Sequence, residues 1–266
     1  MDVRRIIVMG GVSLGVVLAG CGGSSGGGVT GVRSSALASA TKTTAPPASP
    51  TAESSGQARA ALAAAARRLG DDSMRMSLTL GTVITGGGTA DPTTKAMHMS
   101  MRMRGRQAMT VEVRHTGKDV YIRVEGRSFG SLADQWMHIG GDRIPTGLGV
   151  GSAEDPGDAQ RLLQTVVDVH RDGPGRFRGT LDMSKSPQAD PAAIERMGAS
   201  ARAVPFTAEV DEQGRLVGLR VRMDAVAPSM PALQVRYSDF GTPVRVTKPK
   251  GRIIEAPQQM VDAMGG

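Results

Sequence analysis

One run of seven residues constrains the fold of this chain more than any other. From Met97 to Met103 a methionine stands at every second position, and His98, Ser100 and Arg102 stand between them. Successive side chains of a strand point to opposite faces of a sheet, so this period of two gives one apolar and one polar face. The run therefore predicts a strand in a sheet with one buried and one solvated surface.

The same alternation recurs along most of the chain after residue 70. Further runs lie at 74–80, 109–113, 120–124, 177–183, 206–210, 219–223, 233–237 and 244–246. Turn-forming residues at 104–106 and 115–118 separate the central runs, and 211–214 has the composition of a hairpin turn. Strands that follow one another through short turns predict an antiparallel meander.

Three stretches have helical rather than strand spacing. An alanine-rich helix is expected over 57–69, with its leucines on one stripe and Gly70 ending it. Apolar pairs four residues apart predict a second helix over 158–170, and Pro191 in a first turn predicts a third over 190–201. A large sheet with few helices indicates an α+β domain whose helices gather on the apolar face of the sheet.

The only cysteine stands directly after a short apolar segment. Leu18, Ala19 and Gly20 precede Cys21, and an uncharged apolar run at 6–19 follows a pair of arginines. This is the layout of a secretory signal, and the run is too short for a spanning helix, which needs about 20 apolar residues. The ending resembles the bacterial lipobox, which implies that the thiol carries a diacylglycerol and becomes the mature N-terminus. The alternative is an ordinary signal peptide with a stray cysteine.

These features divide the chain into three parts. Residues 1–20 are expected to be a lipoprotein signal peptide, 21–55 a flexible tether and 56–266 a single domain. The tether consists mainly of Gly, Ser, Thr, Ala and Pro, which cannot bury enough surface to fold, and would span roughly 30 Å as a coil. The expected location is extracytoplasmic, on the cell membrane.

Composition restricts the chemistry and the partners. Without a thiol beyond Cys21, the domain cannot form an internal disulfide or use a cysteine nucleophile. The net charge of +7 is spread along the chain, which suits anionic headgroups or cell-wall polymers as well as a generally solvated surface. No motif indicates nucleic-acid binding, and neither a cofactor nor a metal is expected. We expect a monomer.

Three segments resemble LppX-like lipoproteins of actinobacteria, which are relatives of the LolA-type lipid carriers. They are the strand Arg-Gly-Thr-Leu-Asp-Met at 178–183, the hairpin at 205–219, and the run Tyr-Ser-Asp-Phe-Gly-Thr-Pro-Val at 237–244. The resemblance implies a strongly curved antiparallel sheet, a half-barrel, closed by helices around an apolar cavity. It also implies that the domain binds or shuttles an amphiphilic lipid. The many methionines and few aromatic residues depart from the family pattern.

Methionine is flexible and polarizable, and suits a surface that accepts variable apolar partners. The residues expected to line a lipid pocket are Met74, Met76, Met97, Met99, Met101, Met103, Met109, Val111, Val120 and Ile122. Two alternatives remain open. The same residues can fill a solid core, as in an interaction or sensor module without a ligand. The thioethers could also bind Cu(I), although His98 would point away from them.

Enzyme activity is not expected. The G-x-S-x-G pattern at 11–15 lies inside the signal segment, where no active site can form, and the four histidines are scattered without helical spacing. Trp136, the only tryptophan, is expected on a strand on the same side as His138. It would either rim a pocket or a membrane surface, or pack under the glycine-rich loop at 140–157.

Overall fold

A computed structural model describes residues 54–263 except 107, 127–129, 131–132, 141–150, 187–188 and 190. The chain divides into two units, Met1–Ala52 and Glu53–Gly266, and every described residue belongs to the second. The expected signal peptide, the lipobox with Cys21 and nearly all of the expected tether therefore lie outside the described residues.

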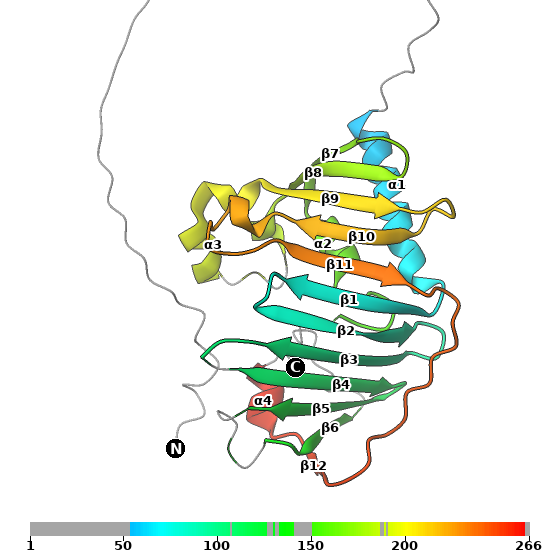
Figure 1. Cartoon of the computed structure of the whole chain (residues 1–266), viewed down its shortest axis with the longest axis vertical. Helices are drawn as coiled ribbons and strands as arrows, with labels where there is room; N and C mark the ends of the chain where they lie inside the picture. Colours follow the sequence, from blue (N-terminus) through cyan, green and yellow to red (C-terminus); the bar gives the residue numbers. More distant parts are fainter. Residues whose placement is uncertain are drawn as a thin grey trace, which may run out of the picture. The chain divides into compact units, whose positions relative to one another are not determined.

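The described domain is built on one open, curved sheet of twelve strands (Figure 1). Its order is β12-β6-β5-β4-β3-β2-β1-β11-β10-β9-β8-β7, so two meanders, β1–β6 and β7–β11, join where β1 pairs with β11. Every pair is antiparallel except β6 and β12. The strands are β1 Met74–Leu80, β2 Ile84–Asp91, β3 Ala96–Met103, β4 Met109–Thr116, β5 Asp119–Glu125, β6 Trp136–Gly140, β7 Val166–Arg171, β8 Arg176–Leu181, β9 Val204–Val210, β10 Leu216–Val221, β11 Leu233–Ser238 and β12 Ile253–Glu255. The predicted α+β class is confirmed.

Helix α1 (Ser55–Arg67) covers one end of the sheet. A capping box begins it, because the Ser54 hydroxyl accepts from Gln57 N and the Gln57 side chain accepts from Ser54 N. Its buried stripe of Ala58, Leu62, Ala65 and Ala66 packs against β7, β9 and β10. The remaining helices are short: α2 Ala159–Leu163, α3 Pro191–Met197 and α4 Gln258–Ala263, with 3-10 turns at Arg68–Gly70, Met183–Lys185, Gly198–Arg202 and Met223–Ala225.

The helix predicted over 158–170 is wrong beyond its first turn. Helix α2 ends at Leu163, and β7 begins at Val166. A bulge lies between Val166 and Asp168, so that the buried side chains of Val166 and Val169 are three residues apart on one face. This spacing imitates that of a helix. The bulged strand faces Gly179, whose Cβ would lie 2.0 Å from the Asp168 carbonyl oxygen.

Two further strands differ from the prediction. Strand β2 was not predicted, because Gly86, Gly87 and Gly88 carry no apolar alternation, yet it pairs along its whole length with β1 and β3. The last strand was expected at 244–246, but residues 242–252 are extended without strand pairing, and β12 follows at 253–255. The hairpin predicted around 211–214 is confirmed by β9 and β10.

Strand β12 is held to the sheet by His138 as well as by backbone pairing. His138 Nδ1 lies 2.7 Å from Glu255 Oε1, and His138 Nε2 lies 2.9 Å from Asp119 Oδ1. Both ring nitrogens face carboxylates, and an imidazole can donate from both only when it is protonated. The hydrogen bonds from Glu255 and Asp119 accordingly raise the pKa of His138, and the bond with His138 lowers the pKa of Asp119.

This arrangement predicts a pH-dependent contribution to stability. A raised folded-state pKa stabilises the fold fully below the unfolded histidine pKa of about 6.5, and the gain is lost as pH rises through the folded value. The lowered pKa of Asp119 acts in the opposite direction. Its contribution to the stability of the fold is present above about pH 4 and is lost as pH falls below that value. We expect the melting-temperature advantage of the wild type over His138→Gln to shrink as pH rises above the unfolded histidine pKa of about 6.5. An advantage independent of pH would contradict the doubly bonded, charged ring.

Candidate functional site

The apolar face of the sheet is organised in rows that run across the strands. Two rows near the start of β1 and β3 are buried, and two rows near their ends are half-buried. The buried rows contain Met74, Ala90, Met97, His115, Val120 and Ile139, and Met76, Gly88, Met99, Val113, Ile122 and Met137. The half-buried rows contain Leu78, Gly86, Met101 and Val111, and Leu80, Ile84, Met103 and Met109.

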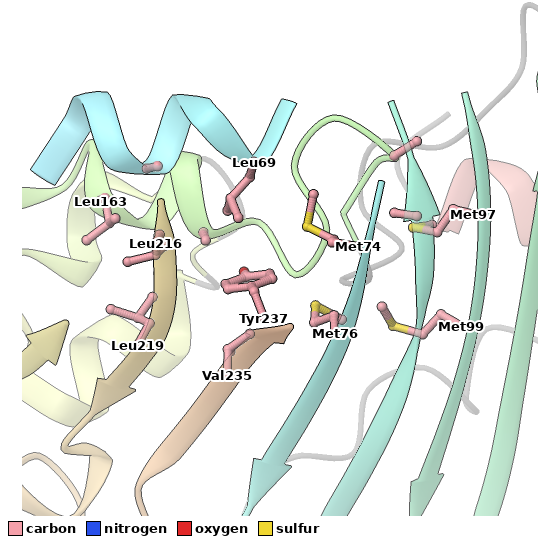
Figure 2. Packing of buried hydrophobic residues seen from close by; sticks show 14 of the residues in the cluster. Leu69, Met74, Met76, Met97, Met99, Leu163, Leu216, Leu219, Val235 and Tyr237 are labelled. Atoms are coloured by element: carbon pink, nitrogen blue, oxygen red, sulfur yellow. The ribbon is translucent and has the colours of Figure 1, made fainter. Parts of the chain in front are cut away.

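The predicted pocket residues therefore fall into two groups. Met74, Met76, Met97 and Met99 are only 1–3% exposed, and with Val120 and Ile122 they belong to the buried core cluster (Figure 2). Met101, Met109 and Val111 pack against that cluster but remain partly exposed, and Met103 is half-buried in the outermost row. The structure thus brings all ten predicted residues to one face but buries six of them completely.

Residues 151–158, here called the covering loop, pack against the buried rows at Met76 and Tyr237. The Tyr237 hydroxyl on β11 donates to the Pro156 carbonyl oxygen at 2.9 Å, and a Cβ at Gly157 would lie 2.8 Å from Met76 Sδ. Asp155 fastens the loop to α2 by accepting from Gln160 N and Arg161 N at 2.8 and 3.2 Å. Burial raises the pKa of Asp155 despite these hydrogen bonds.

The half-buried rows form a continuous apolar surface, here called the apolar rim: Leu78, Leu80, Ile84, Met101, Met103, Met109 and Val111. At Gly86 the Met101 side chain occupies the space that another side chain would take, because a Cβ there would lie 2.6 Å from Met101 Cγ. The Met101 side chain covers the bare backbone of β2 at this point. A flexible thioether over a glycine gives this surface an adaptable shape.

A recess of about 220 Å³ lies beside the apolar rim where β3 turns into β4. Its lining combines apolar and charged groups: Arg102, Met103, Arg104, Ala108, Met109, Thr110 and Glu125. Met103 and Met109 face each other as the last pair before the turn. A second recess of about 130 Å³ is lined mainly by polar side chains of β9, β10 and β11, such as Thr207, Arg220 and Gln234.

The histidines of the central strands do not join the methionines in a metal site. His98 points to the opposite face, where its Nε2 lies 3.0 Å from Glu112 Oε1. His115 does lie on the apolar face, with Nε2 buried and without a hydrogen-bond partner, and burial lowers its pKa. Among the described residues no group of three His, Cys, Asp or Glu side chains is arranged to hold a metal ion.

Trp136 is covered by charged side chains of the polar face. As predicted, it lies on the same side of β6 as His138, whereas Met137 and Ile139 are buried on the other side. The guanidinium groups of Arg114 and Arg123 stand 5.0 and 4.9 Å from its ring centroid. Both arginines also bind Glu112. The indole is 5% exposed, so it lies under this ion-pair network and does not rim the apolar face.

The comparisons with known proteins give no relative. No family model matches the chain, and no curated protein matches it either. None of the helices in the described part of the chain has the length and apolar character needed to cross a bilayer. The site is therefore defined by its own geometry: a buried methionine core under the covering loop, an apolar rim, and a recess with two arginines at the end of the β3–β4 hairpin.

Proposed function

We propose that this protein is a lipoprotein of the cell envelope, anchored through Cys21, whose domain binds or shuttles an amphiphilic lipid on the apolar rim. One observation supports the proposal: across β1–β4 the apolar face is buried at one end of the strands and only half-buried at the other. A surface that only filled a core would be covered along its whole length. The half-exposed end instead presents methionine and aliphatic side chains to a ligand.

The energetics of this contact suit a single acyl chain. Complete burial of one methylene group contributes about 0.8 kcal/mol, so about ten methylenes that cover the open rim gain less than about 8 kcal/mol. Association and ordering costs reduce this gain, which leaves binding in a range that allows release. Such reversible binding is what a carrier needs.

Sequence features outside the described domain support the anchoring part of the proposal. Cys21 follows Leu18, Ala19 and Gly20 after an uncharged segment, as in a lipobox. Within the described domain, the resemblance of 178–183, 205–219 and 237–244 to LppX-like lipoproteins also supports this proposal. The tether would then hold the domain within roughly 30 Å of the bilayer.

A second candidate function is that of an interaction or sensor lipoprotein with a filled core. The observation that favours it is the complete burial of Met74, Met76, Met97 and Met99 beneath the covering loop. In that case the apolar rim would contact a partner protein, and no lipid would accompany the purified chain.

The anchoring and the ligand can be tested on one variant. Cys21→Ala should move the protein from the membrane fraction to the culture medium, whereas Ser24→Ala should leave it in the membrane. Native mass spectrometry of the released Cys21→Ala chain should then show a non-covalent adduct with the mass of a lipid. Release without an adduct, and without uptake of any added acyl lipid, would favour the filled-core candidate.

A further inference from the structure

The recess at the β3–β4 hairpin places positive charge directly beside the apolar rim. Met103 and Met109 belong both to the rim and to the lining of the recess, and Arg102 and Arg104 flank Met103 in the chain. Both arginine side chains are exposed. Because the same recess is lined by Met103, Met109 and both arginines, an acyl chain whose end enters it meets both apolar and cationic residues.

These two arginines are not neutralised by neighbours. Neither forms an ion pair with another residue in the described part of the chain, in contrast to Arg114 and Arg123, which share the carboxylate of Glu112. The acid in the recess, Glu125, pairs with Arg123 at 3.2 Å. The sequence contains no acidic residue between Arg102 and Val111. The recess therefore has an excess of positive charge at its mouth.

Resting on the proposed lipid-binding function, we infer that this recess receives the negatively charged headgroup of the lipid, so that the preferred ligand class is an anionic amphiphile. Arg102 and Arg104 bind the carboxylate or phosphate, and Thr110 offers a hydroxyl on the same wall. Guanidinium groups match the planar geometry of carboxylate and phosphate oxygens. The acyl chain extends from there over Met103, Met109 and the rest of the apolar rim.

The test compares two probes that share a twelve-carbon alkyl chain but differ in their headgroup, together with an anion that has no alkyl chain. The released full chain carrying Cys21→Ala is titrated with dodecanoate, with dodecanol and with inorganic phosphate. We expect dodecanoate to bind about fivefold more tightly than dodecanol, because a charge-assisted pair at an exposed site adds about 1 kcal/mol and each 1.4 kcal/mol is a factor of ten. Inorganic phosphate should bind most weakly, because it lacks the apolar part.

The double variant Arg102→Gln/Arg104→Gln should abolish the preference for dodecanoate and leave dodecanol binding unchanged. The matched control is Arg245→Gln/Lys250→Gln, which removes the same charge from exposed positions on the extended segment 242–252. It should retain the preference. An equal loss in both variants would show a general charge effect and overturn the inference.

Failure of the inference is distinguishable from failure of the proposed function. Equal binding of dodecanoate and dodecanol by the wild-type domain overturns the headgroup site but keeps the lipid-binding surface. Phosphate binding as tightly as dodecanoate would mean an anion site without a lipid component, which also overturns the inference. If neither chain-bearing probe binds, the proposed lipid-binding function itself is wrong.

Discussion

Met99→Lys is expected to unfold the domain, whereas Met101→Lys, two residues further along the same face, should leave it folded and impair lipid binding. Met99 is 2% exposed in the centre of the core cluster, between Gly88 and Val113 of the neighbouring strands. An ammonium group has no partner there, and its desolvation costs several kcal/mol, about 5 or more. That is comparable with the whole stability of a typical domain.

Lysine at position 101 has a different environment. Met101 lies in the half-buried row, so a lysine there keeps its stem on the apolar surface and extends the amine into water. We expect a stability loss of about 1 kcal/mol or less by urea denaturation. The charge would nevertheless lie under the proposed acyl chain, so adducts seen by native mass spectrometry should disappear.

Two controls make this comparison decisive. Met99→Leu and Met101→Leu conserve volume and should cost less than about 1.5 kcal/mol, with lipid binding retained. A folded Met99→Lys would mean that the buried rows are open to water, contrary to the covering loop. Unaltered lipid uptake by a folded Met101→Lys would remove the apolar rim from the proposed function.

Alternation predicted the strands whose faces differ in polarity. β1, β3, β4 and β5 were foreseen because each presents apolar side chains to the core and polar ones to solvent. The prediction from alternation failed for strands whose two faces do not differ in polarity and for a strand whose alternation is interrupted by a bulge. β2 carries glycine in place of side chains, and the bulge after Val166 gives β7 the spacing of a helix.

The sequence predicted which face of the sheet carries the site, but not that the burial of that face decreases along the strands. A period of two places Met97, Met99, Met101 and Met103 together, and they do share one side of β3. Part of the cover over the buried rows comes from the covering loop, whose hydrogen bond between Tyr237 and Pro156 joins residues 81 apart in the sequence. No local pattern encodes such a contact. The arginines of the recess were likewise seen only as the polar half of an alternating strand.

Gly88→Ala is expected to be among the most damaging single-methyl changes in the domain. An added Cβ would lie 1.9 Å from the His98 carbonyl oxygen and 2.8 Å from Met99 Cα, both on β3. These are backbone atoms, so the clash is relieved only if β2 and β3 separate. Overpacking usually costs 1–3 kcal/mol, and we expect about 3 kcal/mol or more here by chemical denaturation.

Gly140→Ala is the matched control, because it adds the same methyl group to a strand of the same sheet. Its Cβ would meet only the His138 ring, with Cε1 at 3.5 Å and Nε2 at 3.9 Å, which are ordinary contacts, and its backbone is not left-handed. Replacing such a glycine reduces the entropy of the unfolded chain and should leave stability unchanged or raise it by up to about 1 kcal/mol. Equal stability of the two variants would mean that β2 and β3 are not pressed together at Gly88.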